Sequence, residues 1–359
     1  MVKPLMAESG ASRRMDGAVS RKVANMAFLC ALLVVVIHLE NVPEGVGSLA
    51  WTVHYFVRYV LAVAAVPYFF LASGYFLARH VDEPGWWGRA MAKRLRTLGI
   101  PYLVWCLVPI VVFSVCWPGY SSAGECWLVK PEPGSIAAAF GLNLFTLPEA
   151  NRPLWYVRAL MLLVLVSPAL VWLLRKGRQW TLLALLALYW SVNTWSLGSP
   201  DWWISVRWRM VWIFGFSLEG LFYFCAGMFL ARRPVRVGGR TALWLGLAGL
   251  VVGLFGMALE AKGVHAYGYP VLVSIPLVML LLWRLMPSAQ WPAALVGSSF
   301  AVYVMHPVVI RAMNASGVLP SGPFRIVVEY VAAVAVTVLL AVALHRALPR
   351  VSPVAFGGR

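Results

Sequence analysis

The feature that most constrains this chain is the apolar run of residues 24–39, ANMAFLCALLVVVIHL, which carries one imidazole, His38, near its end. Its length is close to the roughly 17–25 apolar residues that cross a bilayer. An ionisable group inside lipid is costly, so His38 is a candidate functional residue. The alternative is a histidine satisfied by hydrogen bonds inside a helix bundle, and the residue type alone does not decide between the two.

The rest of the chain is similarly apolar. Of its 359 residues, 61% are hydrophobic and 12% are charged, whereas soluble domains are about half apolar and about a quarter charged. The sequence therefore predicts an all-α, polytopic membrane helix bundle of about ten transmembrane helices. The short apolar stretch 134–148 is expected to be interfacial or re-entrant. The expected spans are residues 24–39, 52–78, 97–117, 153–175, 180–197, 210–231, 241–260, 270–286, 293–311 and 324–347.

The charge balance indicates an orientation in the membrane. Thirty Lys and Arg face 13 Asp and Glu, a net charge of +17, which would also suit a nucleic-acid partner. The basic residues, however, form short clusters between apolar runs, so the positive-inside rule explains them better, and no nucleic-acid partner is expected. This rule predicts that both termini lie in the cytoplasm. The chain is expected to be a multi-pass protein of the inner (plasma) membrane. The expected divisions are a basic tail at 1–23, one transmembrane domain at 24–348 and a tail at 349–359.

The five cysteines show no CxxC motif and no metal-ligand spacing, so no metal is expected. Cys116 and Cys126 lie at and beyond the predicted outer end of the third span. In an oxidising outer compartment they would form a disulfide, and the alternative is two free thiols.

Three further residues are candidates for a site near His38. His306, in the segment YVMHP, ends a predicted span on the outer side and could share a cavity with His38, or it is a helix-terminal histidine satisfied by backbone or water. Glu40 could orient the imidazole, or it lies in a hydrated loop. Arg158 is a better candidate than Arg58, because Arg58 could snorkel to the outer interface.

A basic cluster, Lys93, Arg94 and Arg96, precedes the third span on the predicted cytoplasmic side. It is either a topogenic charge cluster or a seat for an anionic, phosphate-bearing donor. Charge alone does not decide between these readings.

Five segments taken in order resemble the membrane-bound acyltransferase 3 family of glycan O-acyltransferases: ALLVVVIH, VPYFFLASGYFLARH, KRLRTLGIPYLVW, LWYVRALMLLVLVSPAL and SSFAVYVMHPVVI. The resemblance implies transfer of an acyl group, usually acetyl, from cytoplasmic acyl-CoA to a hydroxyl of an extracytoplasmic glycan or glycolipid. By position, His38 takes the place of the family's catalytic histidine. Arg94 takes the place of the first basic residue of its RxxR motif.

Two positions depart from the family pattern. Ala27 stands where members usually carry Arg or Lys, eleven residues before the histidine, with Arg21 and Lys22 the nearest basic residues. Thr97 stands at the second basic position of RxxR, where Lys93 and Arg96 form an offset pair of the same spacing. These departures leave room for a diverged activity, an unusual donor or an inactive paralogue.

The acyltransferase hypothesis assigns the parts as follows. His38 is a general base or a nucleophile, Arg158 or a backbone N–H stabilises the oxyanion, and the basic cluster binds the phosphates of the donor. One rival is a proton-coupled secondary transporter in which His38, Glu219 and Glu329 form a relay. The other is a non-catalytic membrane paralogue.

Overall fold

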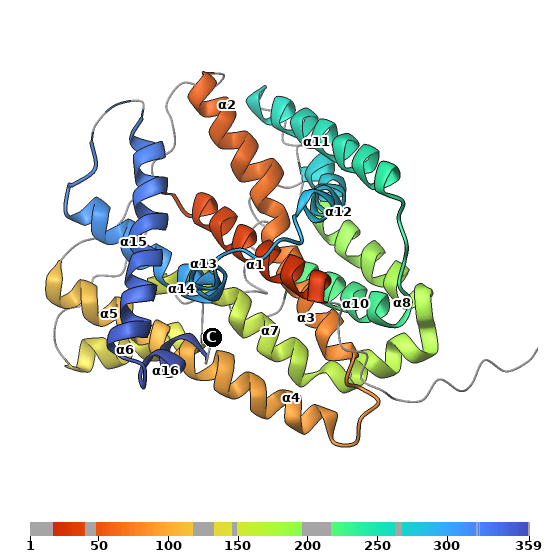
Figure 1. The fold of residues 1–359 in the computed structure, drawn as a ribbon, viewed down its shortest axis with the longest axis horizontal. Coiled ribbons are helices and arrows are strands. Elements are labelled where there is room, and N and C mark those ends of the chain that lie inside the picture. The colour runs from red at the N-terminus through yellow and green to blue at the C-terminus, as the bar shows by residue number, and fades with distance from the viewer. Residues whose placement is uncertain are drawn as a thin grey trace, which may run out of the picture.

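In the computed structural model, the described residues are 17–39, 48–117, 133–145, 149–195, 217–262, 268–320, 322 and 324–357. Within these ranges every regular element is a helix, which confirms the all-α prediction (Figure 1). The α-helices are α1 Gly17–Ile37, α2 Leu49–Phe56, α3 Ala65–Ala78, α4 Trp86–Arg94, α5 Ile100–Cys116, α6 Pro133–Phe145, α7 Trp155–Leu165, α8 Ser167–Trp195, α10 Leu218–Arg232, α11 Gly239–Ala261, α12 Gly268–Leu285, α13 Ala293–Gly297, α14 Ser299–Ala315, α15 Arg325–Ala347 and α16 Ser352–Phe356. Four short helical turns join them: η1 Val57–Leu61, η2 Ala62–Ala64, η3 Leu95–Gly99 and η4 Glu149–Leu154.

Several of these helices can cross a membrane. By length and composition, five helical ranges of the described residues qualify: Gly17–Ile37, Leu49–Ala78, Trp86–Cys116, Gly239–Leu259 and Arg325–Ala347. A bent pair, Asn151–Leu165 and Ser167–Ser191, makes a sixth if its two arms, 63° apart, form one span. The protein is therefore a multi-pass membrane protein, but the expected count of ten spans is not confirmed. Several predicted spans correspond to short helices, since α7 has 11 residues, α10 has 15 and α14 has 17. The start of the predicted span 210–231 lies outside the described residues.

Two of the long helical ranges contain a π-helical turn. The range Leu49–Ala78 passes through η1, which carries Arg58, and the range Trp86–Cys116 passes through η3, which carries Arg96. A π turn inserts an extra residue into the helix ladder and is often found at functional sites. Both turns thus carry arginines that the sequence singled out.

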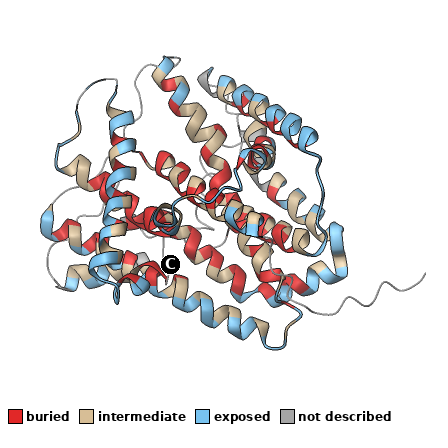
Figure 2. Ribbon diagram, in the orientation of Figure 1, coloured by how far each residue is buried: buried red, intermediate tan, exposed pale blue. Residues whose placement is uncertain are grey.

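The centre of the bundle is built on close backbone approach. A Cβ added to Gly74 of α3 would lie 2.8 Å from the carbonyl carbon of Phe224, and one added to Gly227 of α10 would lie 2.8 Å from that of Leu71. Small residues allow such contacts between membrane helices. In α1, 50% of the most apolar stretch is buried, whereas in α15 the buried share is 22%. Figure 2 shows the buried residues gathered on the central helices.

The end of the chain packs against the bundle. In α16, Phe356 is buried, and the carbonyl of Ala355 accepts a 2.9 Å hydrogen bond from Nε1 of Trp105 in α5. Residues 349–359 therefore include a packed helix. The division of the chain into a tail at 1–23, a transmembrane domain at 24–348 and a tail at 349–359 stays a prediction.

Two other expectations concern the region after α5. Residues 134–148 include α6, and the carbonyl of Leu144 in α6 accepts a hydrogen bond of 3.2 Å from the hydroxyl of Tyr102. Cys116 is exposed at the end of α5, and Cys126 lies outside the described residues. The Cys116–Cys126 disulfide therefore stays a prediction.

Candidate active site

Two histidines from opposite ends of the sequence lie together. His38 follows the last residue of α1, and its backbone N–H donates to the carbonyl of Val35 at 3.1 Å, which continues the helix by one turn. His306 lies within α14, where it is fully buried. The centroids of the two imidazole rings are 5.2 Å apart, with an angle of 44° between the ring planes. The sequence had paired these two residues as candidates for one site.

The hydrogen bonding of His306 determines its tautomer. Its Nδ1 lies 3.0 Å from the carbonyl oxygen of Val302, one helical turn earlier. A carbonyl oxygen only accepts hydrogen bonds, so Nδ1 donates and carries the proton. In the neutral ring Nε2 then keeps a free lone pair, and this buried atom makes no hydrogen bond within the described part of the protein. His306 thus offers a buried acceptor beside His38.

Three arginines lie in the neighbourhood of His38. Arg58 of η1, Arg152 of η4 and Arg311 of α14 all lie near enough to act electrostatically on its ring. Arg311 is buried, Arg58 is half-buried and Arg152 is exposed. Guanidinium groups arranged in this way stabilise a negative charge that develops beside the imidazole. The site therefore combines two imidazoles with nearby positive charge.

A buried asparagine holds η4 in place. Asn151 is fully buried, and its Nδ2 donates to the carbonyl of Val304 at 2.9 Å. Nearby, the hydroxyl of Tyr303 donates to the carbonyl of Pro153. These bonds attach η4 to the turn of α14 that precedes His306, and so place Arg152 near His38. Sequence reasoning missed this role, because an asparagine close to a proline is typical of any loop.

The neighbours of Arg158 differ from those of the arginines near His38, and its role in the site stays a prediction. It is on α7 and faces α5, where it hydrogen-bonds to the hydroxyl of Tyr102 and lies near Cys106. The arginines that act on His38 are those of η1, η4 and α14. The structure therefore places Arg158 beside the start of α5, directly after the η3 turn.

The predicted donor cluster spans the last turn of α4 and η3. Lys93 and Arg96 are exposed and Arg94 is half-buried. Thr97 differs from them, since its hydroxyl is buried without a hydrogen-bond partner among the described residues. A Cβ added to Gly357 would lie 2.9 Å from the carbonyl carbon of Thr97, so the C-terminal segment covers this position.

The other sequence candidates have separate environments. Glu40 lies outside the described residues. Glu219 accepts a hydrogen bond of 3.1 Å from Tyr189, and the fully buried Glu329 accepts one of 3.1 Å from Asn314. The described residues contain no group of three or more His, Cys, Asp or Glu side chains able to hold a metal ion.

The chain is similar to known proteins over most of its length. Residues 26–346 match the model of a family described as an acyltransferase domain. Over 182 residues the chain is 29% identical to the succinoglycan biosynthesis protein ExoH of Rhizobium meliloti (strain 1021). That match covers 48% of this chain and 48% of the relative, so the chain spans about half the length of the curated relative it matches. No solved structure matches the chain.

Proposed function

The chain belongs to the acyltransferase family whose model spans residues 26–346, and on this basis we propose that it transfers an acyl group, usually acetyl, from cytoplasmic acyl-CoA to a hydroxyl of an extracytoplasmic glycan or glycolipid. The relative's role in succinoglycan biosynthesis supports a cell-envelope polysaccharide as the class of acceptor. The observation that carries the proposal is the pair His38 and His306, with ring centroids 5.2 Å apart, inside the family-matched region.

The proposed chemistry starts from an acyl thioester, which is already activated for attack. His38 takes the proton of the acceptor hydroxyl while the hydroxyl oxygen attacks the thioester carbonyl. The tetrahedral intermediate then collapses, the carbon–sulfur bond breaks, and the CoA thiolate receives the proton from the imidazolium. A general base of this kind contributes about 10²–10⁴-fold to the rate. In the variant with His38 as nucleophile, the acyl group passes through an acyl-imidazole.

The arginines near His38 supply the second requirement of this reaction. The intermediate carries a full negative charge on the former carbonyl oxygen, and prearranged cationic groups stabilise it. Arg58, Arg152 and Arg311 act electrostatically on His38, so we assign the oxyanion to this group. His306, held by its Nδ1–H bond to the backbone of α14, serves to position His38.

The donor is proposed to enter from the cytoplasmic side, where Lys93, Arg94 and Arg96 bind its phosphates by charge-assisted hydrogen bonds. Arg158 remains a predicted site residue. Its hydrogen bond to Tyr102, two residues into α5, supports a place along the path of the donor between this cluster and His38. This arrangement requires the orientation that the basic loops favour, with both termini in the cytoplasm and the protein in the inner membrane.

The test is transfer by the purified protein in nanodiscs, with labelled acetyl-CoA and a polysaccharide acceptor. His38→Gln keeps a polar side chain but removes the basicity, and should lower transfer by about 10²-fold or more. The matched control is His80→Gln, because His80 is exposed in the loop after α3 and bonds to Glu83. Substantial transfer by a folded His38→Gln protein would move the chemistry to His306. Binding of acetyl-CoA measured on the same samples separates a lost base from a lost donor site.

A further inference from the structure

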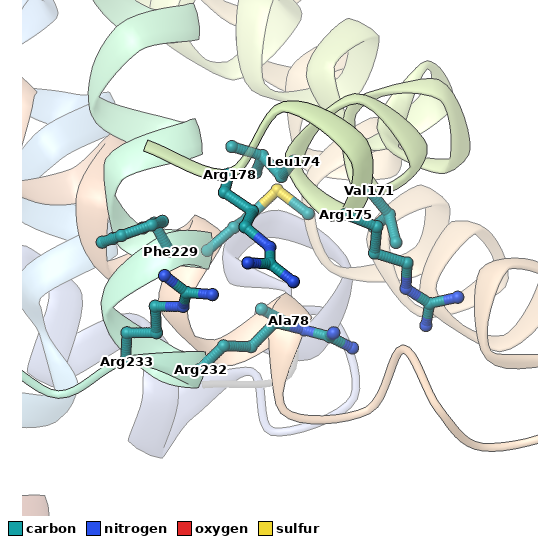
Figure 3. A pocket seen from close by; sticks show the side chains of 9 residues that line it. Ala78, Val171, Leu174, Arg175, Arg178, Phe229, Arg232 and Arg233 are labelled. Atoms are coloured by element: carbon teal, nitrogen blue, oxygen red, sulfur yellow. The ribbon is translucent and has the colours of Figure 1, made fainter. Parts of the chain in front are cut away.

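A second basic feature lies away from the histidine pair. A cavity of about 190 Å³ lies between the end of α3, the middle of α8 and the end of α10. Four arginines line it: Arg175, Arg178, Arg232 and Arg233. Ala78 of α3 and Met228 of α10 are among its apolar lining residues. We name this cavity the four-arginine pocket. Figure 3 shows Arg178 and Arg233 directed toward the same space from α8 and α10.

The charges that line the pocket are poorly balanced. Asp82, in the loop after α3, pairs with Arg175 at 2.6 Å and with Arg232 at 2.9 Å. No acidic side chain in the described ranges is paired with Arg178 or Arg233. One carboxylate therefore serves four guanidinium groups, which repel one another unless an anion enters.

The neighbouring carboxylate is already engaged. Glu83 accepts hydrogen bonds from His80 at 2.7 Å and from Arg89 at 2.8 Å. The bond to His80 first, and then the bond to Arg89, lowers the pKa of the Glu83 carboxyl. Glu83 is thus held on the α4 side of the loop and does not line the pocket.

The backbone at Arg178 is strained. Its φ is 49° and its ψ is −127°, and it is the one non-glycine residue with positive φ in the described part of the chain. Residues other than glycine rarely adopt this conformation, and it persists mainly where function requires it. Gly177, which would adopt it freely, is the preceding residue. A purely topogenic charge would need neither this strain nor the convergence of two helices.

From this geometry we propose that the four-arginine pocket binds a phosphate group. The planar fork of a guanidinium matches the oxygens of a phosphate with two parallel hydrogen bonds, and Arg178 and Arg233 offer two such forks. The source of the phosphate is either a soluble phosphorylated cofactor or the headgroup of an anionic lipid. This binding site is separate from the cluster Lys93, Arg94 and Arg96, and it does not depend on the role of His38.

The test is binding to the full chain, without turnover, so its failure is distinct from failure of the acyltransfer mechanism. Titrations with CoA and with inorganic pyrophosphate use protein in phosphatidylcholine nanodiscs. A second arm measures enrichment of phosphatidylglycerol over phosphatidylcholine around the detergent-purified protein by native mass spectrometry. The variant pair Arg178→Gln/Arg233→Gln should weaken binding of at least one phosphate probe about tenfold or more.

A charge-matched control makes the result specific. Lys176→Gln/Arg236→Gln removes two positive charges from the same two regions of the chain but does not change the lining of the pocket. It should leave binding within about threefold of the native protein, because exposed charges outside a site act weakly. If the glutamine pair does not fold, Arg178→Lys/Arg233→Lys keeps the charge and loses the forks, and should weaken binding by a smaller factor.

One outcome of these binding measurements supports the phosphate site, and two would overturn it. Loss confined to the pocket variants supports the site, with CoA or pyrophosphate indicating a soluble ligand and phosphatidylglycerol indicating a lipid. Equal loss in the pocket and control variants would mean that net charge alone attracts the anions, and would overturn the proposal. Absence of binding by the native protein in both arms would overturn it as well.

Discussion

The crossing of α3 and α10 is the part of the fold whose perturbation can be predicted most sharply. Gly74 of α3 faces the backbone of Phe224, and Gly227 of α10 faces the backbone of Leu71 and Tyr75. The change is Gly227→Ala, with Gly74→Ala as its counterpart on the other helix. A Cβ at position 227 would lie 2.8 Å from the carbonyl carbon of Leu71 and 2.9 Å from the backbone nitrogen of Tyr75.

The magnitude follows from what must move. Carbon and oxygen atoms in close backbone contacts stay about 3.3–3.6 Å apart, and the added Cβ would overlap the carbonyl oxygen of Leu71, so the helices must separate by more than about 1 Å. The atoms that clash with the new Cβ belong to the backbone, so no change of side-chain rotamer can relieve the clash. Forced separation of packed elements costs about 1–3 kcal/mol, and we expect the upper end of this range for each variant. The double variant should cost less than the sum, since one separation relieves both clashes.

The assay is thermal unfolding of the detergent-purified protein, with Gly88→Ala as the control. Gly88 lies on α4, where an added Cβ meets nothing within 4 Å. Alanine there should leave stability unchanged or raise it by up to about 1 kcal/mol through helix propensity. If Gly227→Ala unfolds at the same temperature as Gly88→Ala, the two helices do not cross backbone to backbone and the reasoning is refuted.

Three further predictions concern charge. Arg178→Gly should relieve the backbone strain at positive φ, so the protein should be as stable as the native chain or more stable by up to about 1 kcal/mol. Its binding of phosphate should fall. A lower melting temperature than that of the native protein would contradict the strain. Asp82→Asn should strengthen binding of pyrophosphate measured by titration, because it removes the one carboxylate paired with the arginines of the pocket, and should change stability by less than about 1 kcal/mol because the ion pairs are exposed. Arg94→Gln/Arg96→Gln should raise the KM for acetyl-CoA about tenfold or more with little change in kcat, because each charge-assisted hydrogen bond contributes about 1.5–3 kcal/mol. An unchanged KM in well-inserted protein would show that this cluster does not bind the donor.

The proximity of His38 and His306 could be predicted from sequence because each one ends or interrupts an apolar run on the same predicted side. The arginines around them could not. Arg152 lies near His38 because Asn151 docks η4 on the backbone of α14, and that contact joins residues more than 150 positions apart in the chain. Hydropathy and local propensity carry no signal for such a contact, since it depends on how the helices pack.

The count of ten spans stays a prediction, and the four-arginine pocket was missed in the sequence. The predicted spans 153–175 and 180–197 separate at Arg178, where α8 is kinked. Hydropathy gives no sign of the break at Val166, where α7 ends inside the first of these spans. The pocket arginines read as two separate topogenic clusters in the sequence. They meet because α10 packs against both α3 and α8, and the sequence pattern does not encode that meeting.

The two departures from the family pattern fall on the donor side of the proposed mechanism and leave the histidine site untouched. Ala27 precedes His38 by eleven residues of α1, about 16 Å along a helix, and its side chain packs against the hydrophobic core. The nearest basic residues are engaged elsewhere, since Lys22 lies over Trp283 and Arg21 donates to the carbonyl of Ser288. A positive charge at position 27 would act far from the imidazole, whereas Arg58, Arg152 and Arg311 act on it directly. Under the proposed mechanism, these two departures concern the binding of the donor and not the residues proposed for acyl transfer.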